Sequence, residues 1–486
     1  MYLQYRSLLF IMLGLFMTTC SRNPVTGKKE LSLMSESQEK ALGLESDPQI
    51  QAEFGMYPDS SWQRFLREKG QAMAKISHRP TLGFQFRVID SEVVNAFAVP
   101  GGYIYFTRGI LAHFNDEAQL MGVLGHEIGH VTARHANEQY TKQTIAQIGL
   151  TAGMILSPKF RQFGNLANTG MQLMFLKFSR DNETQSDKLG VEYSSKVGYD
   201  AHHMAEFFQT LGRVSDAAGA RIPSFLSTHP DPGNRFTKVN ELATEAQKQY
   251  TAATKVERNS YIKRLDGMVY GPDPRQGYKE NDNFYHPELK FQFPAPKDWT
   301  YQNSPAQVQF GSKDQKALLI FSLSSDKDLM NAAKSNLKNF NLNLIKQENI
   351  QINGMSAIRL LAEQIPDQNS QGQSTNVNTL KVVSTLIQYD NLIYNFIGAA
   401  APNDFGNFES QFLQCMDGFK KLTDQTKINV KPDRIAVKTV PNKMTFKEVL
   451  KLNNQDVKRY EELAILNGLK QTDILESGFL IKLVSK

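Results

Sequence analysis

The chain has 486 residues, of which 41% are hydrophobic and 21% charged, a composition typical of globular proteins with two to four domains. Its net charge of +6 is spread along the chain without a dense Lys/Arg run, which argues against a nucleic-acid partner. The only two cysteines are Cys20 and Cys415, so no internal disulfide can form if Cys20 carries a lipid.

The first twenty residues differ from the rest of the chain. The ten apolar residues from Leu8 to Met17 are too few to span a bilayer and are typical of the apolar part of a secretory signal. They lead to Cys20, after which the chain is polar. Residues 1–19 are therefore predicted to be a bacterial lipoprotein signal peptide, and Cys20 its lipidated product residue, although a threonine precedes that cysteine where a smaller residue is usual. A plain signal peptide or a short anchor is the alternative.

Helices and a small sheet are predicted in the next hundred residues. A helix is expected from Ser35, and apolar residues recur at helical spacing over 61–76. The strands that we predict are 84–89, 93–99 and 103–107, the last two joined by a Pro-Gly-Gly turn.

Residues 126–130 read His-Glu-Ile-Gly-His, on a helix predicted from about 116 to 135. The residues before this pentad are nearly all apolar or small, so we expect the helix to be buried. Residues four apart lie on one helix face, so His126 and His130 can bind the same metal ion. Glu127 beside them can act as the general base of a zinc peptidase. The alternative is a surface helix with two solvated histidines, and a catalytic zinc needs a third protein ligand.

Spacing decides between the candidates for that ligand. His135 follows His130 by five residues, about 140° round a helix, so it is expected to be a packing or surface residue. The metzincin spacing would need histidine and glycine where Ala136 and Ala133 stand. The metzincin class is therefore rejected.

The better candidate is Glu183, on a helix predicted at 182–196. Asp187 follows by four residues and shares its face. One carboxylate can bind the metal while the other orients a ligating histidine. Taken alone, such a pair is more typical of a solvated face. His229 and Arg235, in a loop rich in Pro and Gly, could steady an oxyanion at the metal, or could be ordinary loop residues.

The sequence pattern changes after the predicted metal-binding helix. Residues 141–178 are apolar and broken by glycines, which predicts helices and a loop that could close over the cleft and keep an enzyme latent. Gly-Pro-Asp-Pro at 271–274 marks a boundary. Strands and helices alternate over 275–425, which predicts an α+β domain. Residues 430–486 are predicted to form a small module of two strands around two helices.

Five sequence motifs follow one another in the first half of the chain. They are NPVTG at 23–27, NAFAVPGGYIYFTRG at 95–109, HEIGHVTARH at 126–135, ETQSD at 183–187 and STHPDPGNR at 227–235. Together they resemble the HtpX/BepA-type zinc metallopeptidases, the gluzincin family that includes the CAAX prenyl proteases. The resemblance implies a mainly helical zincin-type peptidase domain with a small sheet at 20–268, in a multidomain α+β chain.

The resemblance also implies roles for the residues of the site. One Zn²⁺ would be bound by His126, His130 and Glu183, with Glu127 as the general base. Asp187 would support the ligands from behind.

Further roles follow from the same resemblance. His229 and Arg235 would lie beside the catalytic metal. An edge strand would pair with an extended substrate, a mode in which backbone hydrogen bonds give affinity. The residues of this strand would be Asn95, Ala96, Phe97 and Ala98.

The other two regions depart from this family. No membrane span is expected after the signal, and no tetratricopeptide array is found. Residues 275–425 are weakly similar to PsbP/Mog1-type domains, and residues 430–486 resemble a LysM-like module. A structural spacer is the alternative for each.

The sequence thus predicts a lipid-anchored zinc metalloendopeptidase of the cell envelope. It would face the periplasm, with the outer membrane favoured over the inner, and would cleave misfolded or misassembled envelope proteins. Its expected partners are unfolded proteins, the membrane through Cys20, and peptidoglycan through 430–486. A chaperone or assembly lipoprotein with little turnover and a cell-wall-binding lipoprotein are the alternatives.

Overall fold

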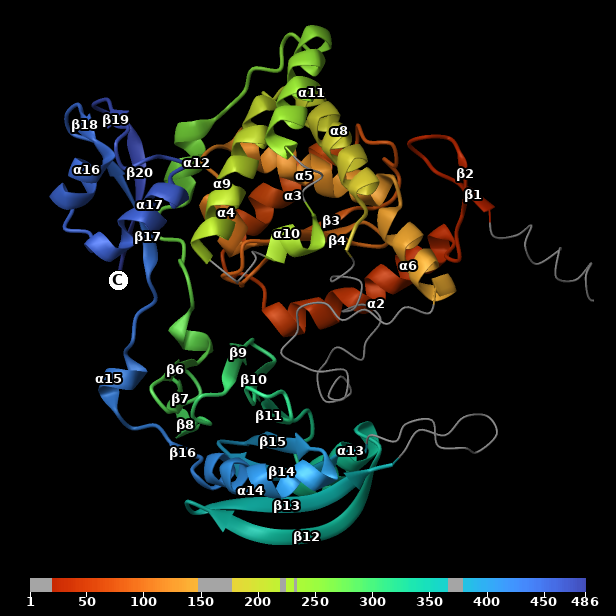
Figure 1. Cartoon of the computed structure of the whole chain (residues 1–486), viewed down its shortest axis with the longest axis vertical. Coiled ribbons are helices and arrows are strands. Elements are labelled where there is room, and N and C mark those ends of the chain that lie inside the picture. The colour runs from red at the N-terminus through yellow and green to blue at the C-terminus, as the bar shows by residue number, and fades with distance from the viewer. Residues whose placement is uncertain (1–19, 147–176, 219–223, 231–233, 366–378) are drawn as a thin grey trace, which may run out of the picture.

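The computed structural model describes residues 20–146, 177–218, 224–230, 234–365 and 379–486 (Figure 1). The predicted signal peptide and most of the segment 141–178 lie outside these residues. A helical body occupies the upper part of Figure 1 and a sheet-rich body the lower part. Within the described ranges, no helix is long and apolar enough to cross a membrane. The predicted class, a multidomain α+β chain, is confirmed.

A three-stranded sheet lies inside the helical body. Its strand order is β3-β5-β4, with β3 (Gln85–Ile89) parallel to β5 (Tyr103–Thr107) and β4 (Ala96–Val99) antiparallel to it. The predicted Pro-Gly-Gly hairpin is confirmed. Its two glycines have φ values of +86° and +91°, which other residues rarely adopt. This hairpin leaves β4 at the edge of the sheet.

Helix α5 (Glu117–Thr132), which carries the pentad, is the buried centre of this body. It packs against α8 (Arg180–Lys196), and glycines let the two backbones come close together. A Cβ on Gly125 would lie 2.9 Å from the carbonyl oxygen of Gly190. The other helices here are α2 (Glu36–Phe54), α3 (Ser60–Ala74), α4 (Arg108–His113), α6 (His135–Ala146), α9 (His202–Ala218), α10 (Ser224–Thr228), α11 (Arg235–Gln249) and α12 (Arg258–Arg264), and a short strand pair, β1 (Cys20–Arg22) with β2 (Lys29–Leu31), precedes them.

The helix predicted from 116 to 135 is in fact two helices. Helix α5 ends at Thr132, and α6 begins at His135. Between them Arg134 has a φ of +59°, in the left-handed region. The prediction of one continuous helix was wrong, because a left-handed residue cannot be continued in a right-handed helix. The turn sends the chain back toward α5.

Residues 274–428, which we call the inserted domain, form the sheet-rich body. Side chains alternate along each strand, so Leu319 and Phe321 join the core under α14 (Pro402–Asp417), while Leu318 and Ile320 face the other side. Helix α13 (Leu329–Asn339) covers that second side. The main sheet has the order β12-β13-β14-β15-β11-β10-β9.

The strands of the inserted domain form two sheets. The long edge strand β12 (Leu342–Ile352) was not predicted, because most of its side chains are polar and exposed. The other strands of the main sheet are β9 (Thr300–Asn303), β10 (Gln307–Gly311), β11 (Ala317–Leu323), β13 (Met355–Gln364), β14 (Lys381–Tyr389) and β15 (Leu392–Ala400). The smaller sheet contains β6 (Tyr278–Glu280), β7 (Asn283–His286), β8 (Phe291–Pro294) and β16 (Lys420–Lys421), and short helical turns lie at η3 (Pro274–Gln276) and α15 (Gln425–Ile428).

Residues 434–485, which we call the C-terminal unit, pack against the helical body. Their apolar side chains belong to the same core as those of the helical body: Phe446 and Ile481 share one buried cluster with Phe114. Lys482 is fully buried and donates from Nζ to the carbonyl oxygens of Ala112 and Phe114, at 2.9 and 3.0 Å. The elements are β17 (Arg434–Thr439), β18 (Met444–Thr445), α16 (Phe446–Leu452), η4 (Val457–Arg459), α17 (Tyr460–Leu466), β19 (Ile474–Leu475) and β20 (Leu480–Ser485).

The chain leaves the helical body and returns to it at one place. The backbone N–H of Tyr270 donates to the carbonyl of Asp433 at 2.8 Å, and Val269 forms a β-bridge with Arg434. The inserted domain therefore interrupts a fold that is completed only by the C-terminal unit.

Candidate metal centre

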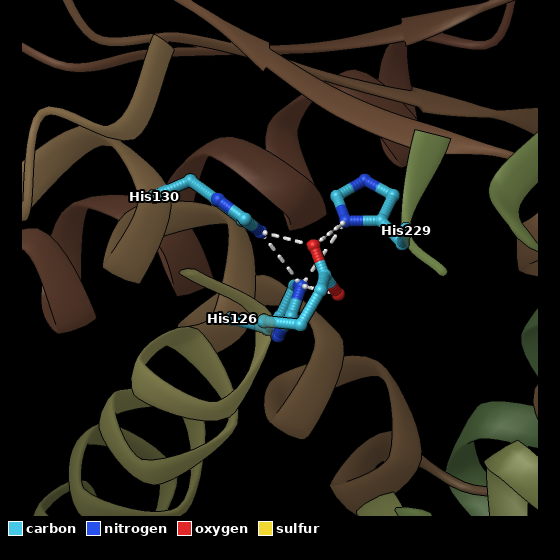
Figure 2. Close-up of side chains that lie close together, drawn as sticks. His126, His130 and His229 are labelled. Carbon is cyan, nitrogen blue, oxygen red and sulfur yellow. Dashed lines mark hydrogen bonds and ion pairs between the residues drawn. The ribbon is translucent and has the colours of Figure 1, made fainter. Parts of the chain in front are cut away.

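Four buried side chains converge beside α5. His126 and His130 come from α5, Glu183 from the first turn of α8, and His229 follows α10 directly. One ligand atom of each lies within 4.8 Å of the ligand atoms of all the others. Figure 2 shows the three imidazoles converging on a common space. The structure thus brings together the three predicted ligands and adds the imidazole of His229.

The helices fix this geometry from local sequence. The four-residue spacing on α5 puts Nε2 of His126 and Nε2 of His130 2.9 Å apart. Ser179 caps α8 in a capping box and so sets where the helix begins. Glu183 in the first turn then reaches His130, with Oε1 3.4 Å from Nε2.

A charged pair supports His126 from behind. Asp187 Oδ1 lies 3.0 Å from Nδ1 of His126, so it can accept the proton of that nitrogen. Arg235 holds the same carboxylate in a bidentate pair, at 2.8 and 2.6 Å, and stacks on Phe208 at 3.9 Å. Burial raises the pKa of Asp187, but the Arg235 charge and the hydrogen bond from His126 outweigh it, so the pKa lies below its ordinary value. Asp187 therefore stays ionised and fixes the ring of His126.

Glu127 and His229 face each other across the cluster. Glu127 Oε1 lies 3.7 Å from His229 Nε2. Both oxygens of Glu127 and Nε2 of His229 are buried without a hydrogen-bond partner. Burial raises the pKa of Glu127, although the nearby histidine charges oppose it. Buried polar atoms without partners are costly, so this space suits a polar reactant held between them.

The ligand set fits a zinc ion. Two imidazoles and a carboxylate are the protein ligands of many catalytic zinc sites, which keep a further position open. Burial lowers the pKa of His130 well below its ordinary value, although Glu183 opposes it, so His130 is neutral and can offer a lone pair. Glu183 has a pKa well below its ordinary value, because the charges and hydrogen bonds around it outweigh its burial.

His135 was expected to be a packing or surface residue. It is only 1% exposed, and its Nδ1 lies 3.0 Å from Nδ1 of His130. Its other ring nitrogen lies 2.9 Å from Gln185 Oε1. Burial lowers the pKa of His135 to about 4. This contact was not predicted, because a single helix was expected to continue through the left-handed turn at Arg134.

The predicted substrate strand lies next to the metal cluster. β4 is the edge strand, and Asn95 directly precedes it, with its side-chain oxygen buried and without a hydrogen-bond partner. A shallow pocket adjoins both β4 and the site. Its lining includes Ala98, Val99, His130 and Phe178. An extended peptide on β4 would therefore pass beside the ligands.

The comparisons with known proteins agree with this geometry. Residues 60–243 match the family model of peptidase family M48. The chain is 27% identical over 258 residues to the beta-barrel assembly-enhancing protease of Yersinia pestis, across 51% of this chain and 52% of that protein. It is 33% identical over 181 residues to the mitochondrial metalloendopeptidase OMA1 of Arabidopsis thaliana, across 36% of this chain and 35% of that protein. The chain spans about half or less of the length of these relatives.

Solved structures match the chain only in part. A cyanobacterial PsbP from Synechocystis matches at 16% identity and a TM-score of 0.24, across 29% of this chain and 91% of that one. The Ran-binding protein Mog1p of Saccharomyces cerevisiae matches at 14% identity and a TM-score of 0.24, across 31% and 99%. Such low TM-scores carry no argument, so the PsbP/Mog1-type resemblance of 275–425 stays a prediction.

The family that the sequence motifs indicated is confirmed by the family model and by these relatives. The matched segment contains α5 and α8, the helices that carry three of the clustered ligands. Residues 60–243 therefore form a domain of peptidase family M48, similar to the HtpX/BepA-type metallopeptidases.

Proposed function

We propose that the chain is a zinc-dependent endopeptidase that cleaves misfolded or misassembled proteins of the cell envelope. One observation carries the catalytic part: Glu127 presents two buried oxygens without hydrogen-bond partners beside His126, His130 and Glu183. The envelope role is supported by the similarity to the beta-barrel assembly-enhancing protease of Yersinia pestis.

In this proposal His126, His130 and Glu183 hold the zinc, which supplies Lewis-acid polarisation and lowers the pKa of water to about 7. Glu127 accepts the proton of the water that attacks the scissile carbonyl. It returns this proton to the amine nitrogen as the C–N bond breaks. The raised pKa of Glu127 suits both transfers, since the carboxylate holds a proton more readily than an exposed glutamate.

His229 supports the same reaction from the opposite side. Its Nε2, which faces Glu127, can donate a hydrogen bond to the developing oxyanion. Burial lowers the pKa of His229, but the charges of Glu183 and Glu127 outweigh it, so the net shift is upward. His229 therefore carries its proton over a wider pH range than an exposed histidine.

Substrate selection in this proposal depends on the backbone. An unfolded segment adds to β4, the edge strand of the sheet among the described residues, and forms main-chain hydrogen bonds whatever its sequence. Folded proteins lack such free extended segments. This mode of binding therefore favours misfolded or unassembled substrates.

Replacement of the base tests the mechanism. Glu127→Gln should keep one zinc per chain and lower the cleavage of unfolded casein at least about 100-fold, because no carboxylate takes the proton. Glu245→Gln, at an exposed glutamate of α11, is the matched control and should leave both unchanged. Normal cleavage by purified Glu127→Gln would contradict the mechanism. A folded, zinc-loaded wild-type chain that binds casein without cutting it would favour the chaperone alternative.

Replacement of the third ligand tests the metal site. Glu183→Ala should lose zinc, measured by elemental analysis after gel filtration, because only two protein ligands stay in place. Asp181→Ala, an exposed carboxylate in the same first turn of α8, is the control and should keep it. Stoichiometric zinc in Glu183→Ala would rule out Glu183 as a ligand.

We further propose that Cys20 anchors the chain by a lipid, facing the periplasm, preferentially at the outer membrane. The support is the apolar segment before this cysteine. Cys20→Ala in the full chain should move the protein from the membrane fraction to the soluble fraction.

We also propose that residues 430–486 bind peptidoglycan. A pull-down of the wild-type chain on purified cell wall tests this binding.

A further inference from the structure

We propose that His135 and Gln185 position the second metal ligand, His130, through a chain of neutral hydrogen bonds. The inference rests on the metal site proposed above and concerns how one of its ligands is held. It makes His135 a positioning residue rather than a catalytic one, since it touches the ligand and not the reacting atoms.

The two histidines of the pentad are supported in different ways. Behind His126 stands the carboxylate of Asp187, 3.0 Å from Nδ1. His130 is supported by the imidazole of His135, whose Nδ1 lies 3.0 Å from Nδ1 of His130. A ligating histidine needs a hydrogen-bond partner for its second nitrogen, because that bond fixes its tautomer and the orientation of its ring.

The proton positions follow from the geometry. Nε2 of His130 faces His126 and Glu183, so it must carry the lone pair for the metal, and the proton is on Nδ1. This N–H can only be satisfied if Nδ1 of His135 is an acceptor. The proton of His135 is then on Nε2, where it donates to Gln185 Oε1 at 2.9 Å. Each neutral ring therefore has one possible tautomer.

The surrounding groups hold the two rings in place. Phe178 stacks on His130 with ring centroids 4.0 Å apart. Ser186 Oγ lies 3.2 Å from Nδ1 of His135 and closes the space beside the hydrogen bond. Gln185 and Ser186 belong to α8, the helix that also supplies Glu183, so one helix provides a ligand and the support of another ligand.

The left-handed turn at Arg134 makes this contact possible. Arg134 donates from Nε to Glu39 at 2.6 Å and from Nη2 to the carbonyl of Met34 at 2.8 Å. Asn23, the first residue of the NPVTG motif, donates to the carbonyl of Ala133 at 3.0 Å. These bonds hold a backbone conformation that a non-glycine residue adopts at a cost. The N-terminal segment thereby fixes the turn that returns His135 to His130.

Zinc affinity of the purified full-length chain, measured by competition with a chelator at pH 7.5, tests the inference. His135→Ala should weaken binding about 10- to 100-fold, the usual effect of removing such a partner. His113→Ala is the matched control, because His113 is a partly buried histidine of the same body whose Nδ1 lies 2.7 Å from the backbone carbonyl oxygen of Gly109, away from the metal ligands. The zinc affinity of His113→Ala should stay within about twofold of the wild-type affinity.

Two changes at Gln185 separate positioning from packing. Gln185→Glu places a carboxylate behind His135, strengthens the hydrogen bond, and should keep or increase the zinc affinity. Gln185→Met has a similar size but accepts poorly, and should weaken zinc binding several-fold.

The outcomes are distinct. Wild-type affinity in folded His135→Ala overturns the inference while the zinc site stands. If His135→Ala does not fold, equal affinities of Gln185→Glu and Gln185→Met overturn it instead. Failure of the wild-type chain to bind zinc overturns the proposed function itself.

Discussion

The inserted domain and the C-terminal unit both follow the peptidase region in the sequence, yet they relate to it in opposite ways. The inserted domain buries its aromatic residues, such as Phe293 and Phe412, in clusters made only of its own side chains. The C-terminal unit has no such separate cluster among the described residues: Phe446 and Ile481 belong to the core that contains Phe114. One region is an independent body, and the other completes the peptidase fold.

This difference shows that the region next to the peptidase region in the sequence is not the region that shares its core. The peptidase core needs residues up to Val484, so it cannot close until nearly the whole chain is available. The inserted domain can form earlier, because its buried apolar clusters contain only its own side chains. Four predictions test this comparison, from the largest expected effect to the smallest.

Truncation before Asp433 should have the largest effect. It removes Phe446, Leu463 and Ile481 from the shared core, and each large buried apolar side chain contributes about 1.5–3 kcal/mol. We expect a chain that no longer binds zinc and is rapidly digested by trypsin across residues 20–268. A truncated chain with wild-type zinc content and melting temperature would show that the C-terminal unit is a separate module.

A pair of core substitutions should separate the two regions. Phe446→Ala and Phe412→Ala each remove a fully buried ring, which costs about 3–5 kcal/mol. Phe446→Ala should lower the temperature at which zinc is released, because its core also holds α5. Phe412→Ala should lower only a zinc-independent transition, followed by calorimetry. Equal shifts of zinc release in both variants would contradict the comparison.

The buried Lys482, which joins the C-terminal unit to the helical body, should make the free energy of unfolding depend on pH. Burial holds the pKa of Lys482 well below its usual range, so the folded chain binds fewer protons than the unfolded chain below about pH 10. The free energy of unfolding should therefore rise with pH from 7 to 10, by at most about 1.4 kcal/mol per pH unit from this group. Urea unfolding of Lys482→Met should lack this part of the slope. An identical slope in Lys447→Met, an exposed control, and in Lys482→Met would speak against a buried charge.

Excision of the inserted domain should have the smallest effect. Tyr270 and Asp433 are joined by a backbone hydrogen bond of 2.8 Å, so a short Gly/Ser linker can replace residues 272–431 without moving either end. We expect a folded protein with unchanged zinc content and a melting temperature within a few degrees of wild type. Loss of zinc on excision would show that the domain supports the site.

Most residues of the site could be predicted from the local sequence. The pentad predicted two side chains on one helix face, and the structure places His126 and His130 2.9 Å apart at Nε2. Glu183 and Asp187 were chosen as a pair four residues apart, and they contact the two histidines from α8. These relations depend on helix geometry, which repeats the same spacing in any surroundings.

The role of His135 could not be predicted in the same way. Helical spacing predicted that His135 points away from the metal. The left-handed backbone of Arg134 instead turns the chain so that His135 contacts His130. That conformation is held by Glu39 and Asn23, about a hundred residues earlier in the chain. A single sequence does not show which distant partners will stabilise an unusual turn.

The sequence by itself predicted the candidate metal ligands and the α+β class, because ligand spacing and alternating hydrophobic patterns are local properties, and its motifs indicated the family. Only the tertiary structure decided that residues 434–485 complete the peptidase core and that 274–428 interrupt it. The contacts responsible join Lys482 to Ala112 and Phe114, and Tyr270 to Asp433. Such contacts arise when distant segments bury their apolar surfaces together, and the local pattern of each segment is the same whether it packs on itself or on a neighbour.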